Sequence, residues 1–181
     1  MPGEGEVVGD SPERRVEILC DRDELCVTWT RFGPFRDGAS RHVHRTHSDL
    51  FFVLGGELTL FVGPEERVLP AGTLAFAPPF LVHGFRNAGD GELRYLNFHA
   101  PSAGFADYLR GRNPDFDQWE PPADGGLPVT EAIVAPRGSS GLLVERDEIR
   151  IEVLDERRPA SPERLTCLYA LEDGRFLEIQ A

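Results

Sequence analysis

Short stretches of β-forming residues, each ended by a turn, recur along most of the chain. The first two stretches, residues 15–20 and 25–30, flank an acidic turn and predict a hairpin. Further stretches follow at intervals of about ten residues, separated by turns that contain Gly or Pro. They are residues 41–44, 50–54, 57–62, 67–69, 74–77, 83–86 and 93–99. Many short strands with this spacing predict an all-β protein, folded as an antiparallel sandwich or barrel.

The same pattern divides the chain into four parts. Residues 1–12 predict a disordered tail, and residues 13–100 contain the strands of a barrel. Residues 101–126 predict one short helix, capped by Ser102, and then a linker rich in proline and acidic residues. Strand alternation returns in residues 127–181, which predict a β extension packed on the barrel or on a partner subunit.

Composition excludes several classes of function. All 19 basic residues are arginine, which excludes a lysine Schiff base and a phosphate-loop lysine. The net charge of −12 argues against a nucleic-acid partner, because an acidic surface repels the phosphate backbone. No stretch is apolar enough to span a membrane, and no signal segment begins the chain. With three cysteines in no metal-type spacing, the sequence predicts a cytoplasmic protein.

Histidine is the residue type that points to chemistry. Three of the five histidines, His42, His44 and His47, lie within six positions, and Asp49 follows them. In a strand His42 and His44 point to the same face, where two neutral imidazoles suit a divalent metal ion. Asp49 could add an oxygen donor and His83 a third nitrogen. The alternative is a polar loop with exposed histidines, and a His83 that only caps a strand. His47 is out of phase with the pair and is predicted to face a loop.

Two segments, residues 38–56 and 72–87, resemble the two sequence motifs of the cupin superfamily. The first motif is His-x-His, four residues, an acidic residue, six residues and a glycine; the second contains glycine, proline, histidine and asparagine. The matching residues are His42, His44, Asp49 and Gly56 in the first motif, and Gly72, Pro78, His83 and Asn87 in the second. The resemblance covers residues 33–100.

This resemblance implies a jelly-roll barrel, also called a double-stranded β-helix, that holds one divalent transition metal ion. It implies His42, His44, His83 and Asp49 as the ligands, and Fe, Ni, Co, Mn or Zn as the metal. The chain departs from the family pattern at three points. Asp49 is one methylene shorter than the usual glutamate, Phe80 stands where glycine is usual, and Gly38 is out of register.

Three imidazoles and one carboxylate leave open positions on a six-coordinate ion, which is typical of catalytic rather than structural sites. The sequence therefore predicts a metal-dependent enzyme that acts on a small organic molecule by oxygenase-type or isomerase-type chemistry. Asp49 could leave the metal and act as a base. The alternative is a non-catalytic module that binds a small molecule, with a structural or absent metal.

A pocket and a partner complete the prediction. The residues expected to line the pocket are Phe51, Phe76, Phe80, Phe85, Tyr95 and His99. A regulator with a DNA-binding domain is set aside, because residues 127–181 are strand-rich and acidic. The edge strands of a small barrel favour a homodimer.

Overall fold

The computed structural model describes residues 5–135, 140–159 and 163–181, and most of these residues lie in strands and loops. The strands are β1 (Glu6–Asp10), β2 (Arg14–Asp21), β3 (Cys26–Phe32), β4 (Ser48–Gly55), β5 (Glu57–Val62), β6 (Glu65–Pro70), β7 (Leu74–Ala77), β8 (His83–Arg86), β9 (Leu93–Ala100), β10 (Ile133–Ala135), β11 (Gly141–Glu145), β12 (Arg150–Leu154), β13 (Thr166–Ala170) and β14 (Phe176–Gln180). The described helices are α1 (Phe105–Leu109) and a single 3-10 turn, Val129–Glu131. The predicted all-β class is confirmed.

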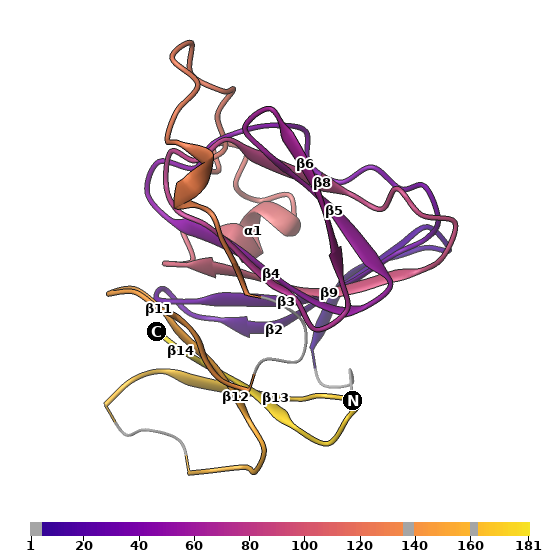
Figure 1. Ribbon diagram of the computed structural model, residues 1–181, viewed down its shortest axis with the longest axis vertical. Coiled ribbons are helices and arrows are strands. Elements are labelled where there is room, and N and C mark those ends of the chain that lie inside the picture. The colour runs from indigo at the N-terminus through magenta and orange to yellow at the C-terminus, as the bar shows by residue number, and fades with distance from the viewer. Residues whose placement is uncertain (1–4, 136–139, 160–162) are drawn as a thin grey trace.

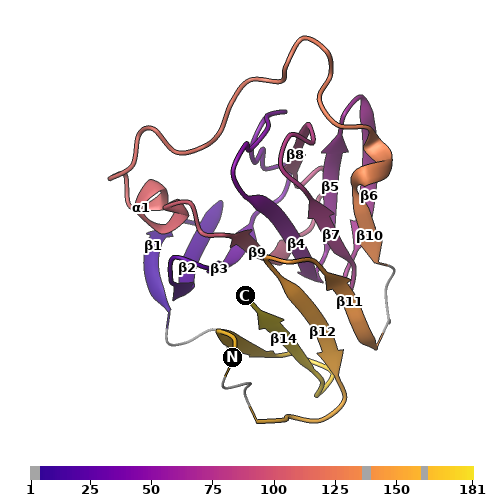
Figure 2. The same cartoon turned by 90° about the vertical axis from the view of Figure 1, so that its left-hand side faces the viewer.

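Three sheets make up the molecule. The largest has the strand order β1-β2-β3-β9-β4-β7-β10, and a three-stranded sheet has the order β6-β5-β8. These two sheets form the jelly-roll barrel, the second lying over the first in Figure 1. A four-stranded sheet, β11-β12-β14-β13, lies on the opposite side of the large sheet. Figure 2 shows α1 beside the ends of β1, β2 and β3.

Strand pairing in the large sheet aligns the residues that face the barrel interior. One row across the sheet runs through Cys26, His99, Asp49 and Ala77, which are successive cross-strand partners on β3, β9, β4 and β7. Because side chains alternate along a strand, residues two positions away on each strand point into the same interior. The register therefore places His99 and Asp49 side by side inside the barrel.

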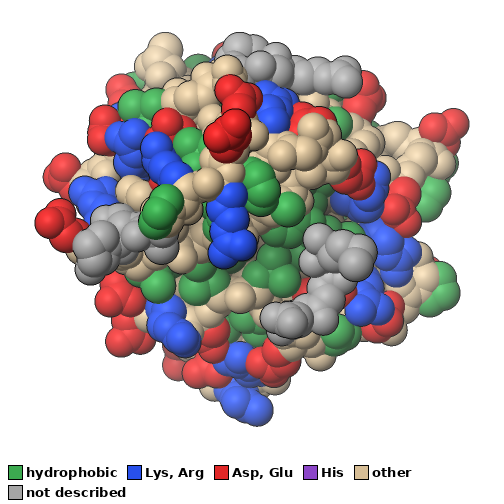
Figure 3. All heavy atoms as spheres, turned by 90° about the horizontal axis from the view of Figure 1, so that it is seen from below, with side chains coloured by type: hydrophobic (Ala, Val, Ile, Leu, Met, Phe, Trp, Pro, Cys, Tyr) green, Lys and Arg blue, Asp and Glu red, His purple; other side chains and the backbone are tan. Residues whose placement is uncertain are grey.

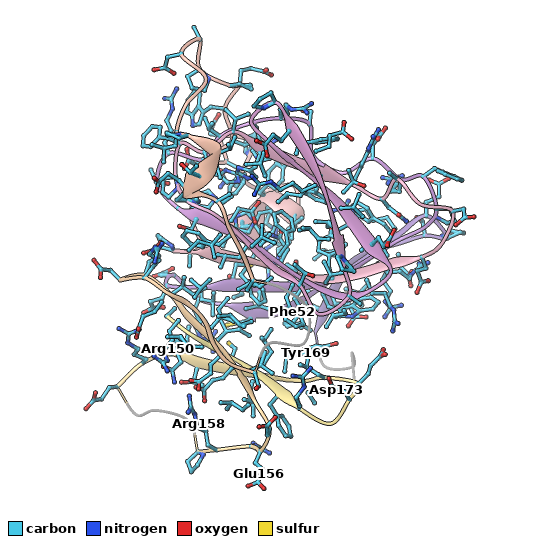
Figure 4. The ribbon with its side chains drawn as sticks, viewed as in Figure 1. Phe52, Arg150, Glu156, Arg158, Tyr169 and Asp173 are labelled. Atoms are coloured by element: carbon cyan, nitrogen blue, oxygen red, sulfur yellow. The ribbon has the colours of Figure 1, made fainter. Side chains whose placement is uncertain are left out.

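The other face of the large sheet forms a core with the C-terminal sheet. Leu50, Phe52 and Phe98 from the barrel are buried in one cluster with Ile151 and Leu177. Figure 4 labels Phe52 on the barrel side and Tyr169 on the C-terminal sheet below it. The described part of residues 127–181 thus packs on the barrel as a further layer, through apolar contacts.

Phe76 belongs to this outer core and does not line the barrel interior, contrary to prediction. It pairs with Leu50, whereas its neighbours Ala75 and Ala77 pair with the inward-facing Phe51 and Asp49. The alternation of side chains along β7 therefore directs Phe76 towards the C-terminal sheet.

The predicted tail at residues 1–12 is wrong for its described part, because β1 pairs with β2 at the edge of the large sheet. Glu6 on β1 also forms an ion pair with Arg110, whose Nη2 lies 2.5 Å from Glu6 Oε2. Backbone pairing and this ion pair hold residues 6–10 against the large sheet, although this segment has no apolar pattern that would predict a strand. The chain before residue 5 lies outside the described residues.

Two further local predictions differ from the structure. Residues 41–44 form no regular strand and make only isolated bridges, from His42 to His83 and from Val43 to Trp119. The helix begins after Gly104, and Ser102 makes no side-chain cap. Both segments are shaped by contacts with distant parts of the chain rather than by local propensity.

The outer surface of the molecule agrees with the acidic, arginine-rich composition. Arg, Asp and Glu side chains are interspersed over the face drawn in Figure 3, and hydrophobic side chains gather near its centre. Within the described ranges, no helix has the length and apolar character needed to cross a membrane.

Candidate metal centre

The structure brings together the four residues expected to bind a metal ion. His42, His44, Asp49 and His83 are all buried, and one ligand atom of each lies within 4.8 Å of the others. Nε2 of His42 is 3.3 Å from Nε2 of His44, and Nε2 of His83 is 3.3 Å from Oδ2 of Asp49. Bonds of about 2.0–2.2 Å to one ion require donor atoms about 3–4 Å apart. The residues present therefore fit a single metal ion.

Backbone carbonyls orient the three imidazoles of this group. Nδ1 of His42 donates to the carbonyl of Ser40 at 2.7 Å, and Nδ1 of His83 donates to that of Leu81 at 2.8 Å. Nδ1 of His44 likewise donates to the carbonyl of Asp117. Each Nδ1 carries the proton, so each Nε2 presents its lone pair to the centre. This is the tautomer that a metal ligand needs.

Charge in the site also suits a metal ion. Burial lowers the pKa of His42 to about 3, helped by the neighbouring His83 and His44, so this imidazole is neutral at pH 7. Burial raises the pKa of Asp49, but His99 and the ligand histidines outweigh that effect and hold it well below its usual range. Neutral imidazole and ionised carboxylate are the forms that bind divalent metals.

Asn97 and His99 hold the other oxygen of Asp49. Nδ2 of Asn97 donates to Oδ1 of Asp49 at 2.5 Å and to the carbonyl of Leu50 at 2.9 Å. Nε2 of His99 lies 3.6 Å from the same Oδ1 atom and donates to Oδ1 of Asn97 at 3.3 Å. Oδ2 of Asp49 is thus left facing the imidazoles. Asn97 shares its strand parity with His99, which is the sequence signal that could have identified it.

His47 does not face a loop, contrary to prediction, but lies buried beside the candidate ligands. Only 1% of it is exposed, and its ring stacks on that of His44 with centroids 4.1 Å apart. Nδ1 of His47 lies 3.2 Å from Oδ2 of Asp117, whereas its Nε2 has no hydrogen-bond partner among the described residues. Burial lowers the pKa of His47 to about 4. Together with His44 and His99 it forms a second close group of potential donors.

The segment predicted as a linker supplies the support for this histidine loop. The Asp117 carboxylate accepts hydrogen bonds from the backbone amides of Arg45 and Thr46, at 2.9 and 2.8 Å. Phe116 packs against the rings of His44 and His47. These contacts turn the loop inward and bury His47. Sequence pattern missed them because residues more than 70 positions apart make them.

Replacing Asp117 with alanine is expected to weaken metal binding without removing a ligand. The loop loses its carboxylate anchor, so His44 is held less firmly, and the affinity for Co²⁺ should fall by about 10-fold or more. Competition with a chelating dye measures this change. Asp115→Ala is the matched control, because Asp115 is exposed and two residues away. Equal affinities of the two variants would show that the anchor has no effect on the site.

A cavity of about 370 Å³ opens next to the candidate ligands. Phe85, Tyr95 and His99 line it as predicted, whereas Phe51 lies fully buried behind the rings of Phe85 and Tyr95. Phe80 does not line the cavity. Its backbone has the left-handed φ of 65° that usually favours glycine, and 48% of the residue is exposed.

Comparisons with known proteins agree with this architecture. Residues 29–99 match the family model described as "Cupin domain". Quercetin 2,3-dioxygenase from Bacillus subtilis (strain 168) is 29% identical over 86 residues, which are 46% of this chain and 26% of that protein. The chain therefore spans about a quarter of the length of this curated relative.

Two solved structures align with part of this chain. KdgF from Halomonas sp. superposes with a TM-score of 0.52 at 20% identity, covering 59% of this chain and 96% of KdgF. An RmlC-like cupin from Shewanella frigidimarina NCIMB 400 has a TM-score of 0.49 at 24% identity, covering 56% and 88% of the two chains.

Proposed function

Because residues 29–99 match the family model of the cupin domain, as the two motifs predict, we propose that this chain is a metal-dependent enzyme. Its substrate is a small organic molecule, and the chemistry is of the oxygenase or isomerase type. The observation that carries this proposal is the group of four buried donors, His42, His44, Asp49 and His83, beside a cavity of about 370 Å³.

The three Nε2 atoms and Oδ2 of Asp49 would hold the ion. A bound divalent transition metal ion supplies Lewis-acid chemistry at such a site and, for a redox-active metal, electron-transfer chemistry. The Ser40, Leu81 and Asp117 carbonyls keep the imidazoles in the metal-binding tautomer. Asn97 keeps one Asp49 oxygen away from the ion, so that the carboxylate offers a single donor atom.

Aromatic side chains in the cavity wall exclude water from the site. Phe105 of α1 stacks on His99 with ring centroids 3.6 Å apart, and Phe116 covers His44 and His47. A site closed by aromatic rings has a low local dielectric, which strengthens the electrostatic effect of a metal ion on a bound molecule. The same wall restricts the substrate to a small molecule.

A non-catalytic binding module is the second candidate. One observation favours it: Asp49 is shorter than glutamate and gives one of its oxygens to Asn97. In that case the histidines and Asp49 hold a structural ion or none, and the cavity only stores or transports its ligand.

Turnover assays distinguish the two functions. Oxygen consumption is measured with quercetin, the substrate named for the curated relative, and isomerisation is followed by exchange of substrate protons for deuterium in NMR spectra. We expect turnover with metal-loaded protein, loss of turnover after chelation, and recovery when metal is restored. Turnover that survives complete metal loss would contradict the metal-dependent mechanism. Metal-loaded protein that binds ligands but turns none over would support the binding module.

A further inference from the structure

The cavity that contains the candidate metal ligands also carries two guanidinium groups. Arg14 of β2 and Arg36, in the loop after β3, both line it. Arg14 pairs in the sheet with Phe32, and the guanidinium of Arg36 lies over the Phe32 ring, 5.9 Å from its centroid. Both arginines are therefore neighbours of Phe32. Along β9, the cross-strand partner of Phe32 is Leu93, six residues before His99. At about 3.3 Å per residue, the two ends of the cavity-facing surface lie roughly 20 Å apart along the strand.

Arg14 has no acidic partner in the part of the chain that the structure describes. None of the described carboxylates lies within 4.0 Å of its guanidinium, although the chain carries 31 acidic residues against 19 arginines. By contrast, the neighbouring Arg15 forms ion pairs with Asp10 and Glu17, both at 2.7 Å. In so acidic a protein, a cavity-lining arginine left without a carboxylate is a potential binding group for an anion.

Arg36 is only partly engaged. Its Nη1 donates to Glu13 at 3.1 Å, while its Nε is buried and has no hydrogen-bond partner. A buried donor without a partner is unfavourable unless a ligand or water satisfies it. Asp37 lines the same cavity and is exposed. With Glu13 it places two carboxylates near the two guanidiniums, but neither lies within 4.0 Å of Arg14.

Aromatic rings occupy the wall between the two ends. Phe32 contacts the rings of Phe85 and Tyr95, with centroids 5.9 and 5.6 Å apart. Burial raises the pKa of Tyr95, so its phenol stays neutral at physiological pH. This surface matches a planar or apolar molecular body, which would stack or pack against it.

We propose that the Arg14 and Arg36 guanidiniums bind the carboxylate of a substrate whose apolar or aromatic body lies along Phe32, Phe85 and Tyr95. The rest of that substrate extends along the cavity towards the histidine group. The guanidinium fork matches the two oxygens of a carboxylate and forms charge-assisted hydrogen bonds with them. This inference rests on the proposed function, since it identifies the substrate class of the same cavity.

Isothermal titration calorimetry with 3-phenylpropanoate and its neutral counterpart, 3-phenylpropan-1-ol, tests the inference on the metal-loaded full chain. We expect the carboxylate to bind at least about 10-fold more tightly than the alcohol, and Arg14→Gln and Arg36→Gln each to remove most of this preference. Arg14→Lys, which keeps the charge but not the fork, should retain part of it. Arg112→Gln is the matched control, because 70% of that side chain is exposed outside the cavity.

The outcomes separate this inference from the proposed function. Equal binding of acid and alcohol, absence of carboxylate binding, or an unchanged preference in both glutamine variants would overturn the inference. Metal content is measured on the same samples, and thermal midpoints show that the variants are folded. Stoichiometric metal together with an unchanged preference in the glutamine variants would overturn the carboxylate subsite alone. Arginine-dependent carboxylate binding in a chain that holds no metal would support the subsite and contradict the metal-dependent enzyme.

Discussion

Replacing His44 with alanine is expected to remove the metal ion from the protein. His44 stands at the middle of the donor group, with its Nε2 3.3 Å from Nε2 of His42 and 3.7 Å from Oδ2 of Asp49. Loss of one of three nitrogen donors should lower metal affinity by about 100-fold or more, beyond the effect of losing a supporting residue. Elemental analysis of untagged protein, purified without chelator, measures the loss beside His42→Ala and His83→Ala.

His47→Gln is the matched control for this experiment. Its ring stacks on His44 and is equally buried, but it is not one of the four predicted ligands, so the variant should keep its metal. If His47→Gln loses as much metal as His44→Ala, the ion uses the second group, His44, His47 and His99. Full metal content in His42→Ala and His83→Ala would show that these histidines do not bind it.

The identity of the metal would then direct the search for the reaction. Near-stoichiometric iron, nickel, cobalt or manganese would favour oxygen-dependent chemistry and make oxygen consumption the first assay. Zinc has no redox chemistry and would direct attention to Lewis-acid reactions such as isomerisation.

Replacing Ile151 with alanine should lower the free energy of unfolding by about 2–5 kcal/mol. Ile151 lies on β12, is 0% exposed, and belongs to the core cluster that contains Phe52 and Phe98 of the barrel. Its truncation leaves a cavity between the large sheet and the C-terminal sheet, because the surrounding side chains relax only partly into the space. Urea unfolding followed by tryptophan fluorescence measures the change, because Trp29 lies in the same cluster.

Leu142→Ala on the neighbouring strand β11 is the control for the core variant. Leu142 is 47% exposed, and surface substitutions usually change stability by less than about 0.5 kcal/mol. An Ile151→Ala variant as stable as Leu142→Ala would mean that the C-terminal sheet does not share the core of the barrel. A single cooperative transition in both variants would indicate that the two parts unfold together.

Local pattern predicted the strands of the barrel closely. β5, β7 and β8 begin and end at the residues that the alternation of apolar and polar positions indicates. Each of these strands is short and is bounded by a Gly- or Pro-containing turn, so local sequence and tertiary packing favour the same structure. The spacing of His42 and His44 also placed two imidazoles together, although the bridge between His42 and His83 replaces the expected strand.

The surroundings of the site were not predictable in the same way. His47 lies out of phase with the pair, and only the anchoring of residues 45–46 by Asp117 turns it inward. Phe76 is an aromatic residue of the kind that lines pockets. Its position along β7 instead directs its side chain to the core between the large sheet and the C-terminal sheet. A proline-rich, acidic segment shows no periodicity, and nothing in it signals that Phe116 packs on the histidines.

The sequence by itself determined the all-β class, the two motifs and the four residues that meet at the candidate metal centre, because each depends on spacing along the chain. The tertiary structure alone decided how Asp49 is shared between the imidazoles and Asn97, which aromatic rings close the cavity, and where Arg14 and Arg36 face it. Those features depend on contacts between segments far apart in sequence. The register of the sheets sets these contacts, and no local pattern of residues encodes it.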